Sequence, residues 1–227
     1  MTRAAIFDLD DTLYEREQFV QSGFAAVADD LQQRFSLPAP WILATLRRAR
    51  VRGHAGWELQ ALCADHGLPS TLVPELVEVI RRHTPLLTLG SLAAAVIAQM
   101  RADGWRLGIL TNGLPATQRA KVEALGLEPR VDAVLYAEEH APGGKPSRAA
   151  FDAALGALGV PACRAVFIGD DLERDVQGAR AAGLATIRVA SALGARRAEG
   201  DADAIISLDE VPVAARRLVK ESGAHAA

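Results

Sequence analysis

Two aspartates one residue apart, Asp8 and Asp10, follow a short apolar run near the start of the chain, in the stretch IFDLDDTL at residues 6–13. Alternate residues of an extended strand point to the same face, so both carboxylates are expected to point the same way, and Asp11 elsewhere. Neighbouring carboxylates raise each other's pKa unless a cation or a shared proton relieves the repulsion. The pair therefore indicates Mg²⁺ binding or acid and base catalysis, and a turn rich in Asp and Thr is the alternative.

Three later segments place polar side chains at the end of an apolar run or just before a helix. They are Thr111 with Asn112, Lys145 after a glycine pair, and Asp170 with Asp171 and Asp175. A hydroxyl and backbone N–H groups at the start of a helix form an anion site, and a lysine at a loop-to-helix junction adds a fixed cation. Taken one at a time, these segments are typical of ordinary turns, loops and helix starts. Because they occur in this order after the aspartate pair, we interpret the four segments together and not as ordinary turns.

The four segments resemble the four motifs of the haloacid dehalogenase superfamily of hydrolases, in the branch with a helical cap inserted after the first motif. The matching stretches are DLDDT at 8–12, TN at 111–112, KP at 145–146, and GDD at 169–171 with Asp175 and GA at 178–179. Asp171 and Arg174 stand where many members carry Ser and Asn. The resemblance covers essentially the whole chain. It implies an α/β fold with a Rossmann-like parallel sheet core flanked by helices and an inserted all-α cap subdomain.

For such an enzyme the resemblance implies a division of labour between the paired carboxylates. Asp8 attacks phosphorus and forms an aspartyl-phosphate. Asp10 protonates the leaving oxygen and later takes a proton from the attacking water. This dual role requires a pKa of Asp10 that is shifted upward, which a crowded carboxylate site can provide.

The remaining motif residues are expected to neutralise the charge of the transferring phosphoryl group. Thr111, Asn112 and Lys145 are the predicted phosphate-binding residues. Mg²⁺ is the expected cofactor, and its predicted ligands are Asp8, the backbone carbonyl of Asp10, and Asp170. Asp171 and Asp175 are expected to support the site, and Asp175 to orient either the Lys145 side or the waters of the metal.

The rest of the chain must bring these segments together. After residue 88, strand-like runs alternate with helical patterns, which indicates a parallel sheet flanked by helices. Strands are expected at 106–110, 133–136, 165–168, 186–189 and 204–206. Helices are expected near 92–100 and before 126, and then at 149–158, 176–182 and 213–219. Ligands in open α/β sheets lie outside the carboxyl ends of strands, so the candidate residues are expected to meet at that edge.

Residues 14–87 follow a different pattern, with helical periodicity and no strand alternation. We therefore predict an α/β catalytic core made of residues 1–13 and 88–227, and a helical cap subdomain made of residues 14–87.

Composition excludes several other classes of protein. The 227 residues, 50% of them hydrophobic, suffice for one sizeable core and a subdomain. A net charge of −3 gives no basic field for nucleic acid, and no run approaches the roughly 20 apolar residues that span a bilayer. The two cysteines have no CxxC or metal spacing. We expect a cytoplasmic monomer or homodimer without nucleic-acid or membrane partners.

The sequence says least about the substrate. In the cap, Arg52, His54 and Trp57 could bind an anionic or planar part of it, although a solvated basic helix face is the commoner explanation. We predict a Mg²⁺-dependent phosphatase that acts on a small phosphorylated metabolite, a sugar or nucleotide monophosphate, through an aspartyl-phosphate. The alternatives are a metal-free 2-haloacid dehalogenase, whose family pattern lacks the second aspartate, a phosphomutase, and a phosphate-binding regulatory protein.

Overall fold

The computed structural model describes residues 2–53, 55–189 and 201–222. It divides the chain into two compact units, an α/β unit of residues 1–16 and 88–227 and a helical unit of residues 17–87. The first boundary follows residue 16 rather than residue 13, because Tyr14 is still tied to Asp10 by a backbone bridge and by its hydroxyl.

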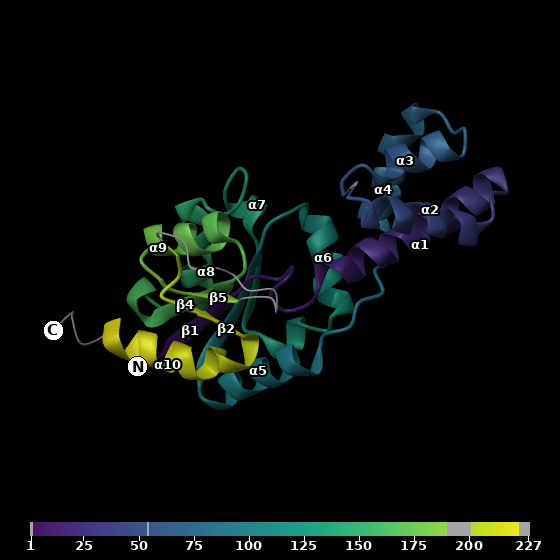
Figure 1. Ribbon diagram of the computed structural model, residues 1–227. Helices are drawn as coiled ribbons and strands as arrows, with labels where there is room; N and C mark the ends of the chain where they lie inside the picture. Colours follow the sequence, from purple (N-terminus) through teal and green to yellow (C-terminus); the bar gives the residue numbers. More distant parts are fainter. Residues whose placement is uncertain (1, 54, 190–200, 223–227) are drawn as a thin grey trace. The chain divides into compact units, whose positions relative to one another are not determined.

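The α/β unit is built on a parallel sheet (Figure 1). Among the residues that the structure describes, six strands follow the order β3-β2-β1-β4-β5-β6. They are β1 (Arg3–Phe7), β2 (Trp105–Thr111), β3 (Ala133–Tyr136), β4 (Ala165–Gly169), β5 (Ala185–Val189) and β6 (Ala204–Ile206). All pairings are parallel. The predicted Rossmann-like α/β fold is confirmed, and each predicted later strand lies within one residue of an observed one.

Helices cover both faces of this sheet. They are α5 (Ser91–Ala102), α6 (Pro115–Ala124), α7 (Ala137–His140), α8 (Arg148–Leu158), α9 (Gly178–Ala181) and α10 (Val211–Ser222). Short helical turns are η2 (Glu128–Arg130), η3 (Ala162–Arg164), η4 (Leu172–Gln177) and η5 (Leu208–Glu210). In Figure 1, α5 and α10 lie on one face of the sheet, and α8 and α9 lie on the other.

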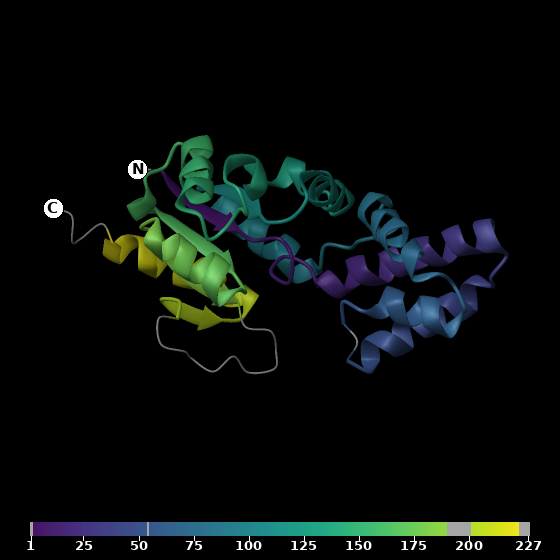
Figure 2. The same ribbon diagram turned by 90° about the horizontal axis from the view of Figure 1, so that it is seen from above.

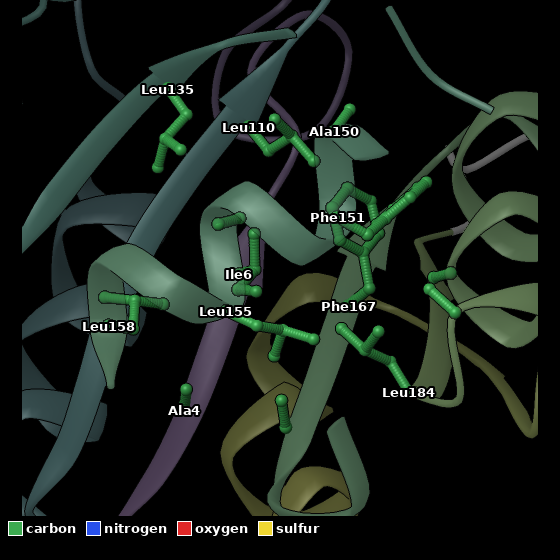
Figure 3. Packing of buried hydrophobic residues seen from close by; sticks show 14 of the residues in the cluster. Ala4, Ile6, Leu110, Leu135, Ala150, Phe151, Leu155, Leu158, Phe167 and Leu184 are labelled. Atoms are coloured by element: carbon green, nitrogen blue, oxygen red, sulfur yellow. The ribbon is translucent and has the colours of Figure 1, made fainter. Parts of the chain in front are cut away.

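A buried apolar core between α8 and the sheet holds the strands in position. Figure 3 shows Ile6 of β1 and Phe167 of β4 packed against Phe151 and Leu155 of α8, all of them buried. The rings of Phe151 and Phe167 meet edge to face with centroids 5.2 Å apart. A Cβ on Gly108 of β2 would lie only 2.9 Å from the Leu158 side chain of α8, so a glycine here leaves room for that helix. These contacts hold the carboxyl ends of β1 and β4 in place.

One helix differs from the expectation of a single helix at 176–182. The chain turns into η4 at Leu172 and continues into α9 only at Gly178. The turn begins early because the Asp171 carboxylate accepts hydrogen bonds from the backbone N–H groups of Glu173 and Arg174, at 2.9 and 2.8 Å. The side chain after β4 therefore acts as a helix cap.

The helical unit, residues 17–87, has its own core. Its helices are α1 (Arg16–Phe35), α2 (Ala39–Val51), α3 (Glu58–Asp65) and α4 (Val73–Arg82), with the turn η1 (Ser70–Leu72). Figure 2 shows α1 as the longest of them. Each helix contributes an apolar face to one buried cluster, represented by Leu31, Ile42, Leu62 and Leu76. Across the described residues, no helix combines the length and apolar character needed to cross a membrane.

Candidate active site

The site lies where the strand order reverses, between β1 and β4. Phe7, the last residue of β1, pairs with Ile168 of β4 on one side and with Ile109 of β2 on the other. The backbone N–H of Asp8 donates to the Ile168 carbonyl at 2.8 Å, which continues the pairing by one residue. Asp8, Thr111 and Asp170 are therefore brought to one edge of the sheet, as ligand sites of open α/β folds require.

A buried lysine joins two of the predicted carboxylates. The Lys145 Nζ atom donates to Asp8 Oδ1 at 2.6 Å and to Asp175 Oδ1 at 2.7 Å. The three residues are 3%, 7% and 2% exposed, respectively. Asp175 lies beside Lys145, which is one of the two places that the sequence left open for it, and the alternative of orienting the waters of the metal stays a prediction. Because each charge is removed from water, each depends on the others for compensation.

The loop that carries Lys145 is held by Asn112. The Asn112 Oδ1 atom accepts from the Lys145 backbone N–H at 2.8 Å, and its Nδ2 donates to the Lys145 carbonyl at 2.9 Å. Gly144 has a φ of 65°, and a Cβ there would lie 2.6 Å from Asn112 Oδ1. The Asn112 amide thus positions the lysine. Direct contact of Asn112 with a phosphate stays a prediction.

A group of carboxylates lies next to this lysine. Asp8, Asp170 and Asp175 each offer an oxygen within 4.8 Å of the others. Asp175 can reach this position because residue 169 is a glycine. A Cβ on Gly169 would overlap the Asp175 carboxylate. Its Oδ2 atom also accepts from the Asp171 N–H at 3.1 Å. Two of these three carboxylates contact the Lys145 ammonium, which leaves an excess of negative charge that a divalent cation would relieve.

Two of these carboxyls, Asp8 and Asp170, have raised pKa values, and burial is the main cause. Burial raises the pKa of Asp8 to about 7, although the Lys145 ammonium acts to lower it. Burial also raises the pKa of Asp170 to about 6, and the Asp175 carboxylate adds to the shift. Burial acts to lower the pKa of Lys145, but the two carboxylates outweigh it and hold that pKa above its usual value. The lysine is therefore charged over the whole physiological range.

The second aspartate of the pair has a different environment. Asp10 Oδ1 accepts from the Tyr14 hydroxyl at 2.5 Å and from Lys121 Nζ at 2.7 Å. Asp10 Oδ2 accepts from Lys121 Nζ at 2.9 Å and from Gln118 Nε2 at 2.9 Å. Burial would raise the pKa of Asp10, but Lys121 and the other donors outweigh it and lower that pKa. The expectation of a raised pKa is wrong for this arrangement, because three donors surround the carboxylate.

Sequence reasoning missed Gln118, Lys121 and Tyr14. Gln118 and Lys121 lie three residues apart on α6, on the same buried face as Val122. The available signal was the presence of polar residues at helix positions where the periodicity predicts buried apolar side chains. Gln118 Nε2 also donates to Thr111 Oγ1 at 2.7 Å and to the Asn112 carbonyl. It therefore links two of the four predicted segments, the one with Asp10 and the one with Thr111 and Asn112.

The predicted cap residues lie in the helical unit. Arg52 and Trp57 are exposed, Trp57 with 66% of its surface accessible, and His54 lies outside the described residues. Several basic neighbours of Arg52 are paired within the unit. Arg48 contacts Asp65 at 3.1 Å, and Arg50 contacts both Glu17 and Glu58 at 2.7 Å. These pairs account for part of the basic helix face without a ligand.

Comparisons with known proteins agree with this arrangement. The family model for haloacid dehalogenase-like hydrolases matches residues 2–183. The ribulose-1,5-bisphosphate 5-phosphatase of Halopiger xanaduensis is 32% identical over 204 residues, which covers 82% of this chain and 84% of that protein. The glyceraldehyde 3-phosphate phosphatase of Methanocaldococcus jannaschii is 26% identical over 196 residues, which covers 83% of this chain and 85% of that protein.

Solved structures share the fold. The HAD-hydrolase YfnB from Bacillus subtilis, bound to magnesium, aligns with a TM-score of 0.65 at 22% identity and covers 94% of this chain and 98% of that one. A 2-haloacid dehalogenase from Pseudomonas syringae pv. Tomato aligns with a TM-score of 0.64 at 27% identity and covers 96% of this chain and 99% of that one. On the family match and the shared motifs, the chain belongs to the haloacid dehalogenase-like hydrolases.

Proposed function

We propose that this hydrolase is a Mg²⁺-dependent phosphatase that hydrolyses a small phosphorylated metabolite, a sugar or nucleotide monoester. The observation that carries the proposal is the buried group of Asp8, Lys145 and Asp175 beside Asp170. It combines a carboxylate nucleophile, a fixed cation for phosphoryl oxygens and a carboxylate cluster for a hard metal ion. Two relatives that span most of the chain, named as phosphatases of sugar phosphates, support it.

In this proposal the two aspartates divide the reaction. Lys145 engages only Oδ1 of Asp8, and the other oxygen attacks phosphorus as the bond to the leaving oxygen breaks. Asp10 donates its proton to that leaving oxygen, and then takes a proton from the water that hydrolyses the aspartyl-phosphate. The pKa of Asp10 is low in the structure, and the negative charge of a bound phosphate would raise it again.

The residues present fit magnesium. The cluster offers oxygen ligands only, and Lys145 neutralises only part of its charge. Asp8, the backbone carbonyl of Asp10, and Asp170 would hold the ion. When bound, Mg²⁺ would neutralise charge on the phosphoryl oxygens. Thr111, Asn112 and Lys145 are the proposed phosphate-binding residues, and Asn112 also fixes the lysine loop.

Removal of the metal is expected to abolish phosphatase activity. Rates would be measured with p-nitrophenyl phosphate, glyceraldehyde 3-phosphate, ribulose 1,5-bisphosphate and a pyrimidine 5′-nucleotide, with Mg²⁺ and with excess EDTA. We expect hydrolysis to stop in EDTA and to return on addition of Mg²⁺, because the carboxylates otherwise repel the anionic substrate. Undiminished hydrolysis in EDTA would contradict the metal requirement. Halide release from 2-chloropropionate in EDTA would favour the dehalogenase alternative. This reaction is tested because one structural relative is named as a 2-haloacid dehalogenase.

Metal binding is also expected to depend on pH in a predictable direction. With pKa values of about 7 for Asp8 and about 6 for Asp170, both carboxyls are mostly protonated at pH 5 and ionised at pH 8. A cation binds the ionised forms, so Mg²⁺ should raise the Tm more at pH 8 than at pH 5. The variant Asp170→Asn should lose most of this shift. A Tm shift that is equal at both pH values would contradict the assignment.

The helical unit is proposed to select the substrate. An inserted subdomain can exclude water and contact the part of the substrate remote from phosphate. We expect Arg52→Ala and Trp57→Ala to change the ranking of natural esters by kcat/KM more than they change p-nitrophenyl phosphate hydrolysis. Trp41→Ala is the matched control. Trp41 is 66% exposed, like Trp57, but it lies near the start of α2, whereas Arg52 follows the end of that helix. Equal losses on all esters would mean that specificity is not read at these residues.

A further inference from the structure

Four hydrogen bonds fill the coordination of the Asp10 carboxylate. An ionised carboxylate has about four lone-pair positions, two on each oxygen. Tyr14 and Lys121 occupy those of Oδ1, and Lys121 and Gln118 occupy those of Oδ2. To exchange a proton with a leaving oxygen or a water, Asp10 must therefore give up one of these bonds.

Lys121 is the partner that permits such an exchange. It contacts both oxygens, so it can release one and keep the other, whereas Tyr14 and Gln118 each contact one. Lys121 is 5% exposed, and burial lowers the pKa of its ammonium. A buried ion pair often adds little stability compared with apolar residues of similar volume. Stability alone is thus a weak reason for a lysine here.

Gln118 fixes the same carboxylate to the neighbouring strand. Its Nε2 atom donates to Asp10 Oδ2 at 2.9 Å and to Thr111 Oγ1 at 2.7 Å. Its Oε1 atom is buried and has no hydrogen-bond partner among the residues that the structure describes. An unpartnered buried acceptor costs roughly 1–3 kcal/mol. The hydrogen bonds that the Nε2 atom donates must therefore offset this cost and fix the orientation of the amide.

We propose that Lys121, together with Gln118 and Tyr14, is a positioning residue for hydrolysis that acts through Asp10. The inference rests on the proposed phosphatase function. Lys121 holds the Asp10 carboxyl in one orientation while a lone pair passes to the leaving oxygen or to the attacking water. The proton moves from Asp10 to the leaving oxygen as the P–O bond breaks, and from water to Asp10 in the second step. Lys121 itself stays outside the bonds that change.

The test compares esters that do and do not need a proton on the leaving group. p-Nitrophenolate leaves without one, whereas the sugar alkoxide of glyceraldehyde 3-phosphate requires one. For Lys121→Met we expect kcat/KM to fall roughly 10- to 100-fold on glyceraldehyde 3-phosphate, or on whichever alkyl ester the wild type hydrolyses best, and to fall much less on p-nitrophenyl phosphate. Lys121→Arg should recover part of the loss. Arg119→Met, at an exposed position on the same helix, should leave both rates unchanged.

A double-mutant cycle decides whether Lys121 acts through Asp10. In the Asp10→Asn background, adding Lys121→Met should cost little more, because the positioned group is already absent. Tyr14→Phe removes a single hydroxyl and serves as the second variant if Lys121→Met fails to fold. Additive losses, or equal losses on both esters, would overturn the assignment. A wild-type protein that hydrolyses none of the esters would instead contradict the proposed function itself.

Discussion

Asp8→Asn is expected to abolish turnover of every phosphate ester, with a loss on the order of 10⁴-fold or more. The substitution keeps the volume of the side chain that follows β1 but removes the carboxylate proposed as the nucleophile. Lys145 would still be paired with Asp175 at 2.7 Å, so the fold should persist. Steady-state rates on p-nitrophenyl phosphate, a thermal unfolding curve, and trapping of phosphoenzyme after a short pulse with labelled substrate would measure the effect.

Asp10→Asn is the informative comparison for that variant. Asp10 lies two residues after Asp8, in the turn that follows β1. The variant should still form phosphoenzyme from p-nitrophenyl phosphate, whose leaving group needs no proton. Its turnover should fall roughly 100- to 10,000-fold, the range of a general acid or base. If Asp8→Asn retained appreciable steady-state activity, or if Asp10→Asn alone failed to form phosphoenzyme, the roles assigned to the two aspartates would have to be abandoned.

The edge of the sheet where the site forms could be predicted from the sequence because strand ends are a local property. Asp8, Thr111 and Asp170 each end an apolar run or directly follow one, and parallel pairing brings those ends together whatever lies between them. The approach of Lys145 to Asp8 depends on a loop before α8, so the sequence indicated it only through the resemblance to a family.

The surroundings of Asp10 could not be predicted in the same way. Counting carboxylates near Asp10 in the sequence suggests a raised pKa, whereas the pKa is lowered by Lys121, which is 111 positions away in the chain. Similarly, the partner of Asn112 is the backbone of Lys145, 33 positions away. Contacts between distant helices and loops are set by tertiary packing, and no pattern of apolar residues records which polar groups they bring together.

The two aspartates of the pair therefore belong to different electrostatic environments. On one side, Asp8 and Asp175 share the ammonium of Lys145, Asp170 lies beside these two carboxylates, and the pKa values of Asp8 and Asp170 are raised. On the other side, Asp10 meets an ammonium of its own and two further donors. The proposed Mg²⁺ would compensate the excess charge of the first side only. This difference supports the proposed division between a nucleophile and an acid or base.

Lys145→Met is expected to lower kcat/KM on all esters alike, because the ammonium acts on the phosphoryl group that the esters share. The variant should also be less stable, by about 3–5 kcal/mol at pH 8, since two buried carboxylates lose their common partner. The side chains concerned are almost inaccessible to water, at 2% for Lys145 and Asp175. Purified protein would be compared with the wild type by denaturant unfolding and by kinetics in saturating Mg²⁺.

The pH dependence of that stability distinguishes a lost charge from lost packing. Without the ammonium, the pKa of Asp8 should rise further above its unfolded value, so the folded variant binds more protons than the unfolded chain. Stability relative to the wild type should then improve as the pH falls from 8 to 5, because a proton replaces the missing cation. Asp175→Asn in the same background should restore part of the stability at pH 8, since it removes one of the two unpaired carboxylates, but it should restore no activity. A stability deficit that is equal at pH 5 and pH 8 would mean that Lys145 contributes packing rather than charge. A loss of kcat/KM confined to some esters would mean that Lys145 contacts the leaving group rather than the phosphoryl group.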